Sequence, residues 1–122
     1  MKRVVLVIAL GLAGCSTLTN IAGTTVSPSQ VVIAGNSFDA LEATATNYLR
    51  LPTCPVQAPV CKNSASVGPI VSAVHAGRTA RTDMIGYVTA NPGQAVPVSR
   101  YDTLKASVDS LNTLFAQYNV KG

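Results

Sequence analysis

The stretch YDTLKASVDSLNTLFAQY, residues 101–118, decides the fold class of this chain. Its large apolar side chains recur at alternating steps of three and four residues, at Tyr101, Leu104, Val108, Leu111, Phe115 and Tyr118. This period places them on one side of an α-helix, as a heptad seam over nearly three repeats. Ser99, with Asp102 three residues later, has the pattern of a capping box in which Asp stands in the Glu position. The sequence predicts a helix over residues 99–119 whose seam is buried against other helices.

A second helix is predicted over residues 66–90, with Ser66 at its start and Pro69 in its first turn, where a missing N–H does no harm. Its apolar residues fall in two groups on either side of a polar interruption at residues 77–83. Gly77 and Gly86 either weaken this helix or permit the close approach of a neighbour. We expect it to contribute Val67, Val71, Val74, Ile85 and Val88 to the core, from an apolar stripe that also contains Ile70 and Met84.

A third helix is predicted over residues 36–51, with Asn36 or Ser37 as N-cap and Asp39 in the first turn. It ends before Pro52, which disfavours helical geometry in the residue ahead of it. Its apolar face consists of Phe38, Leu41, Ala45 and Tyr48.

Three helices joined by short proline-bearing loops favour an up-down-up arrangement. The sequence shows no internal repeat at a fixed period and no alternation of strands and helices. We therefore expect an all-α fold, a small antiparallel three-helix bundle formed by residues 36–122.

The N-terminus has the organisation of an export signal. Lys2 and Arg3 come before a nine-residue run that ends at Leu12 and is apolar except for one glycine. Two small residues, Ala13 and Gly14, then precede Cys15. Nine residues are too few to span a bilayer, which needs about 20. A buried strand or helix is the alternative, but it has no need of leading cations or of a small-small-Cys ending. We expect residues 1–14 to be a signal peptide.

The closing residues Leu12-Ala13-Gly14-Cys15 resemble the lipobox of bacterial lipoproteins, and the resemblance covers the first sixteen residues. It implies a diacylglyceryl group on the Cys15 thiol, cleavage just before Cys15 and an acyl chain on the freed amine. It also implies sorting to the outer membrane, because Ser16 stands where retention at the inner membrane typically uses Asp. Two or three acyl chains anchor a protein stably where one alone is marginal. The resemblance thus implies a mature chain of residues 15–122 that is held at the periplasmic face of the outer membrane.

Residues 16–35 are rich in Ser, Thr, Gly and Asn and carry no charged side chain. This composition is typical of a flexible spacer, so we expect residues 15–35 to be a tether between lipid and bundle. The triplet Val31-Val32-Ile33 leaves three interpretations open: plain linker, a piece docked on the bundle, or a short extended segment.

Two further cysteines, Cys54 and Cys61, lie in a proline-rich loop. Export would place them in an oxidising compartment, where structural disulfides persist, so we expect a Cys54–Cys61 bridge. Their spacing does not match the Cys-x-x-Cys motif of redox enzymes. Two cysteines and one distant histidine are also too few for a zinc site, and we expect no metal.

The basicity of the chain comes partly from its N-terminus. The full sequence has nine Lys and Arg against five Asp and Glu. Without Lys2 and Arg3 the balance is seven against five, a charge of +2. This value gives no basic patch of the kind that nucleic-acid binding needs, so we expect no nucleic-acid partner.

One polar cluster is a candidate site. His75, Arg78 and Arg81 follow one another at three-residue spacing on one helix face, and an antiparallel hairpin brings Asp39 and Glu42 to their level. A salt-bridged layer is one interpretation, and an anion-binding or partner-docking patch is the other.

Catalysis is not indicated, because a nucleophile needs a base within hydrogen-bond reach and a group that orients this base. His75 is the only histidine, and no nucleophile elbow or phosphate-binding glycine loop accompanies it. We expect no enzyme activity, and no cofactor beyond the covalent lipid.

The remaining hypothesis is a structural or interaction lipoprotein that contacts the membrane through its lipid and contacts another envelope protein through its body. One alternative is a lysis-associated lipoprotein resembling the outer subunit of phage spanins, which neighbouring holin and endolysin genes would favour. A second is a small-ligand carrier, which needs an apolar cavity with a few convergent polar groups.

Overall fold

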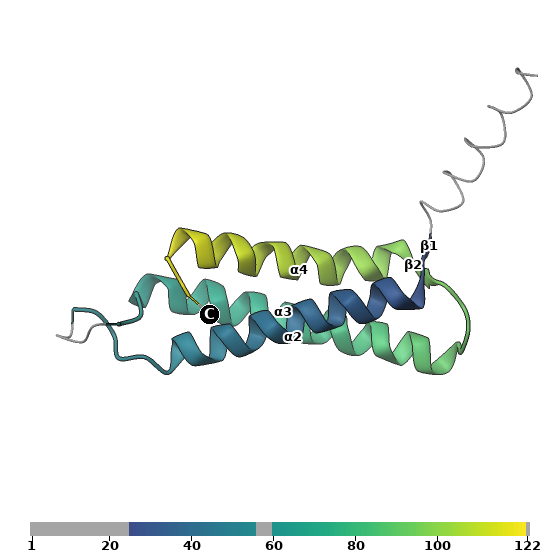
Figure 1. The fold of residues 1–122 in the computed structure, drawn as a ribbon, viewed down its shortest axis with the longest axis horizontal. Coiled ribbons are helices and arrows are strands. Elements are labelled where there is room, and N and C mark those ends of the chain that lie inside the picture. Colours follow the sequence, from purple (N-terminus) through teal and green to yellow (C-terminus); the bar gives the residue numbers. More distant parts are fainter. Residues whose placement is uncertain (1–24, 56–59, 122) are drawn as a thin grey trace, which may run out of the picture.

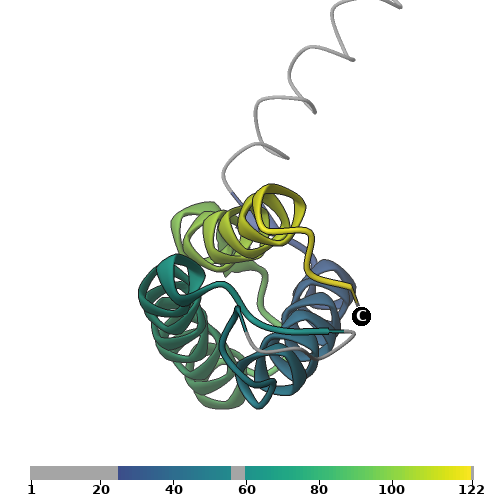
Figure 2. The ribbon, with the colours of Figure 1, turned by 90° about the vertical axis from the view of Figure 1, so that its left-hand side faces the viewer.

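The computed structural model describes residues 25–55 and 60–121, and these form a bundle of three antiparallel helices. The helices are α2 (Pro28–Leu49), α3 (Ser64–Ala90) and α4 (Val98–Gln117), and two short strands, β1 (Thr25–Val26) and β2 (Val96–Pro97), lie at one end. Figure 2 looks along the bundle and shows the three helices at the corners of a triangle. The predicted all-α, antiparallel three-helix bundle is confirmed.

The core runs the length of the bundle and draws on all three helices. Its large, fully buried side chains are Phe38, Ile70, Met84, Leu104 and Leu111. The seam of α4 is oriented as predicted, with Leu104, Leu111 and Phe115 buried and the other three seam residues half-buried. On α2, three of the four predicted residues are buried and Leu41 packs against the core.

The first helix begins at Pro28, so the prediction of a start at residue 36 is wrong. Ser27 is the N-cap: its Oγ accepts from the Gln30 backbone N–H, and Gln30 Oε1 accepts from the Ser27 N–H at 3.1 Å. This capping box, with proline at the first helical position, gives the helix a strong start.

The earlier start of α2 shortens the predicted tether, residues 15–35. Residues 28–35 form the first two turns of α2, and Val31 and Ala34 lie in the core. The triplet Val31-Val32-Ile33 is therefore helical. The rest of that tether up to residue 24, the predicted signal peptide at residues 1–14 and Cys15 lie outside the described residues.

Helix α3 begins two residues before the predicted start. Asn63 is its N-cap, because the Asn63 side chain accepts from the Ala65 N–H at 2.9 Å. Ser66, the predicted opening residue, is fully buried inside the helix.

The core face of α3 differs in part from the prediction. Val74 is buried, but Val71 and Ile85 are 37% and 44% exposed, and Val67 and Val88 are half-buried. Each exposed residue follows a buried apolar neighbour in the chain, and one step along a helix turns the side chain by about 100°. The face that meets α2 and α4 consists of Ser66, Ile70, Val74, Gly77, Ala80 and Met84.

The predicted capping box of the last helix is also wrong. Helix α4 starts at Val98, directly after β2, with Pro97 in the N-cap position and no side-chain cap. Because the preceding residues pair with β1, the helix begins where the strand pairing ends, one residue before Ser99. It ends at Gln117, and Asn119 then adopts a left-handed backbone conformation with φ 53°.

The two ends of the bundle are closed differently. At one end β1 and β2 pair antiparallel, with Val26 opposite Val96, and both of these side chains are buried. At the other end Cys54 and Cys61 form the predicted disulfide, with their Cα atoms 5.2 Å apart. Lys62 next to it donates from Nζ to the Leu49 carbonyl at 2.6 Å, which ties the loop to the end of α2.

A buried tyrosine also joins α2 to the start of α3. The Tyr48 hydroxyl accepts from the Asn63 N–H at 2.8 Å and lies 3.0 Å from Ser66 Oγ. Ser66 Oγ in turn donates to the Asn63 carbonyl at 2.6 Å. This small network satisfies the buried hydroxyls and fixes the angle at which α3 leaves the disulfide loop.

Candidate functional site

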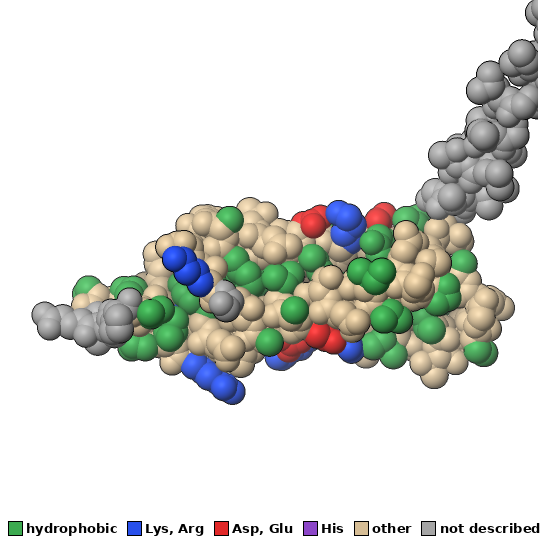
Figure 3. Space-filling view, viewed as in Figure 1, with side chains coloured by type: hydrophobic (Ala, Val, Ile, Leu, Met, Phe, Trp, Pro, Cys, Tyr) green, Lys and Arg blue, Asp and Glu red, His purple; other side chains and the backbone are tan. Residues whose placement is uncertain are grey.

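The polar cluster predicted between the first two helices forms two ion pairs between α2 and α3. Arg81 pairs with Asp39: its Nη2 donates to Oδ2 at 2.8 Å, and its Nε lies 2.7 Å from Oδ1 at an angle that makes no hydrogen bond. One turn away, Arg78 donates from Nε to Glu42 Oε1 at 2.5 Å. Figure 3 shows acidic and basic side chains next to one another midway along the bundle.

These pairs leave little free positive charge for an anion. Both guanidinium groups face a carboxylate, and the Arg78 and Glu42 side chains are 54% and 23% exposed. Exposed pairs of this kind contribute roughly 0.2–1 kcal/mol each. The geometry favours a surface salt-bridge layer over an anion-binding patch.

His75 does not join this layer. Its side chain is exposed on α3 and makes no hydrogen bond or ion pair within the described residues. Only its backbone carbonyl is engaged, by the Thr79 hydroxyl at 3.2 Å. The shared helix face that the sequence predicted therefore holds two paired arginines and one solvated histidine.

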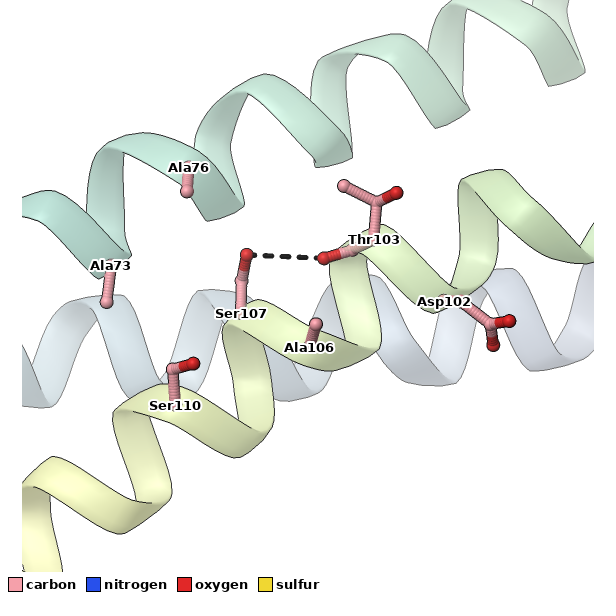
Figure 4. A pocket seen from close by; sticks show the side chains of 7 residues that line it. All are labelled: Ala73, Ala76, Asp102, Thr103, Ala106, Ser107 and Ser110. Carbon is pink, nitrogen blue, oxygen red and sulfur yellow. Dashed lines mark hydrogen bonds between the residues drawn. The ribbon is translucent and has the colours of Figure 1, made fainter.

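A groove between α3 and α4 was not predicted from the sequence. It is lined by short side chains: Ala73, Ala76, Asp102, Thr103, Ala106, Ser107 and Ser110. Figure 4 shows Ser107 bonded to the Thr103 carbonyl, a 3.3 Å contact within α4, and Asp102 pointing away from α3. The clue in the sequence was the recurrence of Ala and Ser at helical spacing next to the apolar seam.

This groove is a surface trough. Its volume of about 550 Å³ falls in the range of ligand pockets, but such pockets bury most of their ligand's surface. Here the walls are mostly methyl groups and hydroxyls on the outside of two helices, and the Asp102 carboxylate points away from α3. The trough allows the side chains of a partner to approach both helices closely.

A second groove, between the first turns of α2 and the last turns of α3, has larger apolar side chains in its walls. It is lined by Pro28, Val31, Val32, Gly35, Asn36, Arg81, Met84, Ile85 and Val88. Val32 is 59% exposed, and its neighbour Ile33, further round α2, is 64% exposed. The sequence placed these residues in a spacer and so gave no reason to expect an apolar surface here.

Two further observations concern the described residues alone. Nowhere in residues 25–55 and 60–121 do three or more His, Cys, Asp or Glu side chains come together to hold a metal ion. Within the same ranges, each helix is too short or too polar to cross a membrane.

The site and fold together define a disulfide-bridged helical bundle with two open grooves and a paired arginine layer. Comparison with protein-family models, with curated proteins and with solved structures finds no match to this chain.

Proposed function

We propose that this protein is a lipid-anchored protein of the bacterial envelope, at the periplasmic face of the outer membrane, whose helical body has a structural or protein-interaction role. One observation carries the proposal: the sequence Leu12-Ala13-Gly14-Cys15 directly behind a short apolar run with two leading cations. That order serves export followed by lipidation, and a cytosolic helix has no use for it.

The disulfide supports the exported location. Cys54 and Cys61 are bridged, and structural bridges of this kind persist in oxidising compartments such as the periplasm. With these two paired, Cys15 is the third cysteine of the chain and is available for lipid.

The surface of the bundle supports an interaction role over catalysis. The groove between α3 and α4 presents alanine methyls and serine hydroxyls, which allow another chain to come close to both helices. The single histidine of the chain, His75, lies apart from any carboxylate or hydroxyl partner among the described side chains. A general base needs such a partner to orient it.

Labelled palmitate tests the anchor. The wild-type protein should incorporate the label in cells, and Cys15→Ser should not. The double variant Cys54→Ser/Cys61→Ser is the matched control, because it removes two thiols and should keep the label. Incorporation into Cys15→Ser would show that the lipid is attached elsewhere, and an unlabelled wild type would show that it is absent; either result would refute the proposal.

Photocrosslinking in intact cells tests the interaction role. A photoreactive side chain at Ala76 or Ser110 lies in the groove between α3 and α4, whereas one at Asn47 lies on the exposed side of α2. We expect an adduct with an envelope protein from the two groove positions and none from the control. If no position gives an adduct, the interaction role is wrong and the body is passive.

A further inference from the structure

One end of the bundle carries no charge. Residues 25–38 and 84–99 contain no Asp, Glu, Lys or Arg. They form the start of α2, the end of α3, the connection through β2 and the start of α4, which lie together at the end where β1 enters (Figure 1). On the face shown in Figure 3 most charged side chains lie midway along the bundle or towards the opposite end, and one acidic group on the upper edge lies nearer to the end where β1 enters. We call residues 25–38 and 84–99 the charge-free end.

The charge-free end is also where apolar side chains face solvent. Val32, Ile33 and Ile85 are three of the five large hydrophobic side chains that stand out as exposed among the described residues. Val31 and Ala34 turn inward, so the first turns of α2 carry apolar side chains on both the core side and the solvent side, next to the exposed polar residues Ser29, Gln30, Asn36 and Ser37. Apolar side chains that gather on a surface mark a contact with protein or membrane.

The polar groups of this end suit a lipid interface. They are hydroxyls and amides. The charged residues that border them in the sequence are Asp39, Asp83 and Arg100, and the Arg100 guanidinium lies 5.2 Å from the centre of the Tyr87 ring. Tyrosine is enriched at membrane–water interfaces, and arginine reaches from such positions to the headgroups.

We propose that the charge-free end rests on the lipid surface in which Cys15 is anchored, so that the bundle stands with its disulfide end away from the membrane. This inference rests on the proposed function. Nine residues separate Cys15 from Thr25, and ten peptide steps span at most about 35 Å. The anchor therefore keeps this end near the bilayer and raises its effective concentration there.

The opposite end has a different character. Arg50, Lys62 and Lys121 lie there, close to the disulfide loop and the C-terminus. Helix α2 has 22 residues and so is about 33 Å long. Contact of the cationic end with lipid would require the bundle to lie flat or to stand on its other end, and tryptophans at both ends of α2 detect either arrangement.

Single tryptophans give the test, because the chain has none of its own. Ile33→Trp and Asn47→Trp place the probe at exposed positions of the same helix, one at the charge-free end and one near its other end. Each mature lipidated protein, residues 15–122, is reconstituted into vesicles of phosphatidylethanolamine and phosphatidylglycerol with or without brominated acyl chains. An interfacial helix lies about 5–10 Å into the headgroup boundary. We expect a blue-shifted emission and loss of fluorescence to bromolipid at position 33 and neither change at position 47.

Three results would overturn the inference. Tryptophan at 33 that stays as exposed to water as that at 47 would show an end held clear of the lipid. Quenching at 47 alone would show the opposite orientation. If aqueous iodide fails to quench the tryptophan at position 33 and bromolipid fails as well, a protein, such as a second copy of this chain, covers that position.

A second pair of variants separates apolar contact from mere tethering. Gln94→Trp reports from the exposed connection at the same end, and adding Val32→Asp and Ile85→Asp should abolish its quenching while circular dichroism keeps its helical signal. Quenching that persists would mean that the apolar side chains do not hold the end down. Flotation with vesicles tells the two proposals apart: protein that floats without quenching refutes only this inference, and protein that does not float refutes the lipid anchor as well.

Discussion

The ring of Phe38 on α2 occupies the space that a side chain at Gly77 of α3 would need. A Cβ built on Gly77 would overlap three carbons of this ring, and both residues are buried. The absence of a side chain at Gly77 therefore lets α2 and α3 approach each other closely, at a point next to the paired arginines of α3.

We expect Gly77→Ala to destabilise the fold. Overpacking a core costs about 1–3 kcal/mol, which exceeds the gain of about 1 kcal/mol in helix propensity. Urea unfolding followed by circular dichroism measures the difference. Gly86→Ala is the matched control, because nothing lies within 4 Å of a Cβ there, and it should stabilise α3 by about 0.5–1 kcal/mol. Equal effects at the two glycines would contradict the close contact.

Tyr48→Phe should destabilise the bundle by about 1–2 kcal/mol. The substitution leaves the Asn63 N–H without its 2.8 Å acceptor and removes the partner of the buried Ser66 Oγ. Tyr118→Phe is the control, since the Tyr118 hydroxyl makes no hydrogen bond within the described residues. A Tyr48→Phe protein with unchanged unfolding midpoint would rule out a structural role for the network.

The ion pair between Arg78 and Glu42 should show up as coupling in a charge-swap cycle. Arg78→Glu and Glu42→Arg each place like charges together, and the double variant restores attraction. Because these side chains are partly exposed, we expect a coupling of roughly 0.2–1 kcal/mol that shrinks in high salt. If the double variant is no more stable than the sum of the single ones, the pair is not formed in solution.

The pKa of Lys105 should lie above its usual range. Its Nζ donates to Asp109 Oδ2 at 2.9 Å, and this hydrogen bond, with the charge of Asp109, favours the protonated amine. The resulting stabilisation is present at neutral pH and is lost as the pH rises through the raised pKa. NMR titration of Asp109→Asn should return the Lys105 pKa towards its ordinary value. Asp102→Asn should move it less, since Asp102 acts only through its charge.

Loss of the disulfide should cost about 2.5 kcal/mol on the chain-entropy model for a loop of this length. The Cys54→Ser/Cys61→Ser protein should therefore unfold at lower urea than the wild type while keeping its helical spectrum. The wild type treated with a reductant should match the double variant. A reductant effect on the double variant itself would reveal a contribution from elsewhere in the chain.

The helix boundaries and the core differ in how far the sequence predicts them. The seam from Tyr101 to Tyr118 fixes the last helix because one period runs through it without a break. On α3 the apolar pairs Ile70-Val71 and Met84-Ile85 each offer two faces, and a periodic pattern alone cannot choose between them. Packing against α2 and α4 determines which face is buried. Gly77 and Ala80 lie on the face that contacts these helices, so Ile70 and Met84, which share that face, turn inward, and Val71 and Ile85 stay exposed.

The missed first turns of α2 have a local cause. Their composition resembles a spacer, but Ser27-Pro28-Ser29-Gln30 is a capping box with proline at the first position, and it marks the helix start. Of the polar cluster, the pairing of Asp39 and Glu42 with arginines follows from antiparallel geometry. The two grooves do not, because they depend on how far apart the helices settle.

The pairing of Val26 with Val96 also determines how the bundle would bear a mechanical load. Because β1 pairs with β2, tension applied to the chain ahead of Thr25 passes both into the first turn of α2 and, through this pair, into the connection between α3 and α4. The force is then divided among all three helices at the end of the bundle where it is applied. A pull along the N-terminal chain has to break the strand pairing before it can unwind α2 by itself.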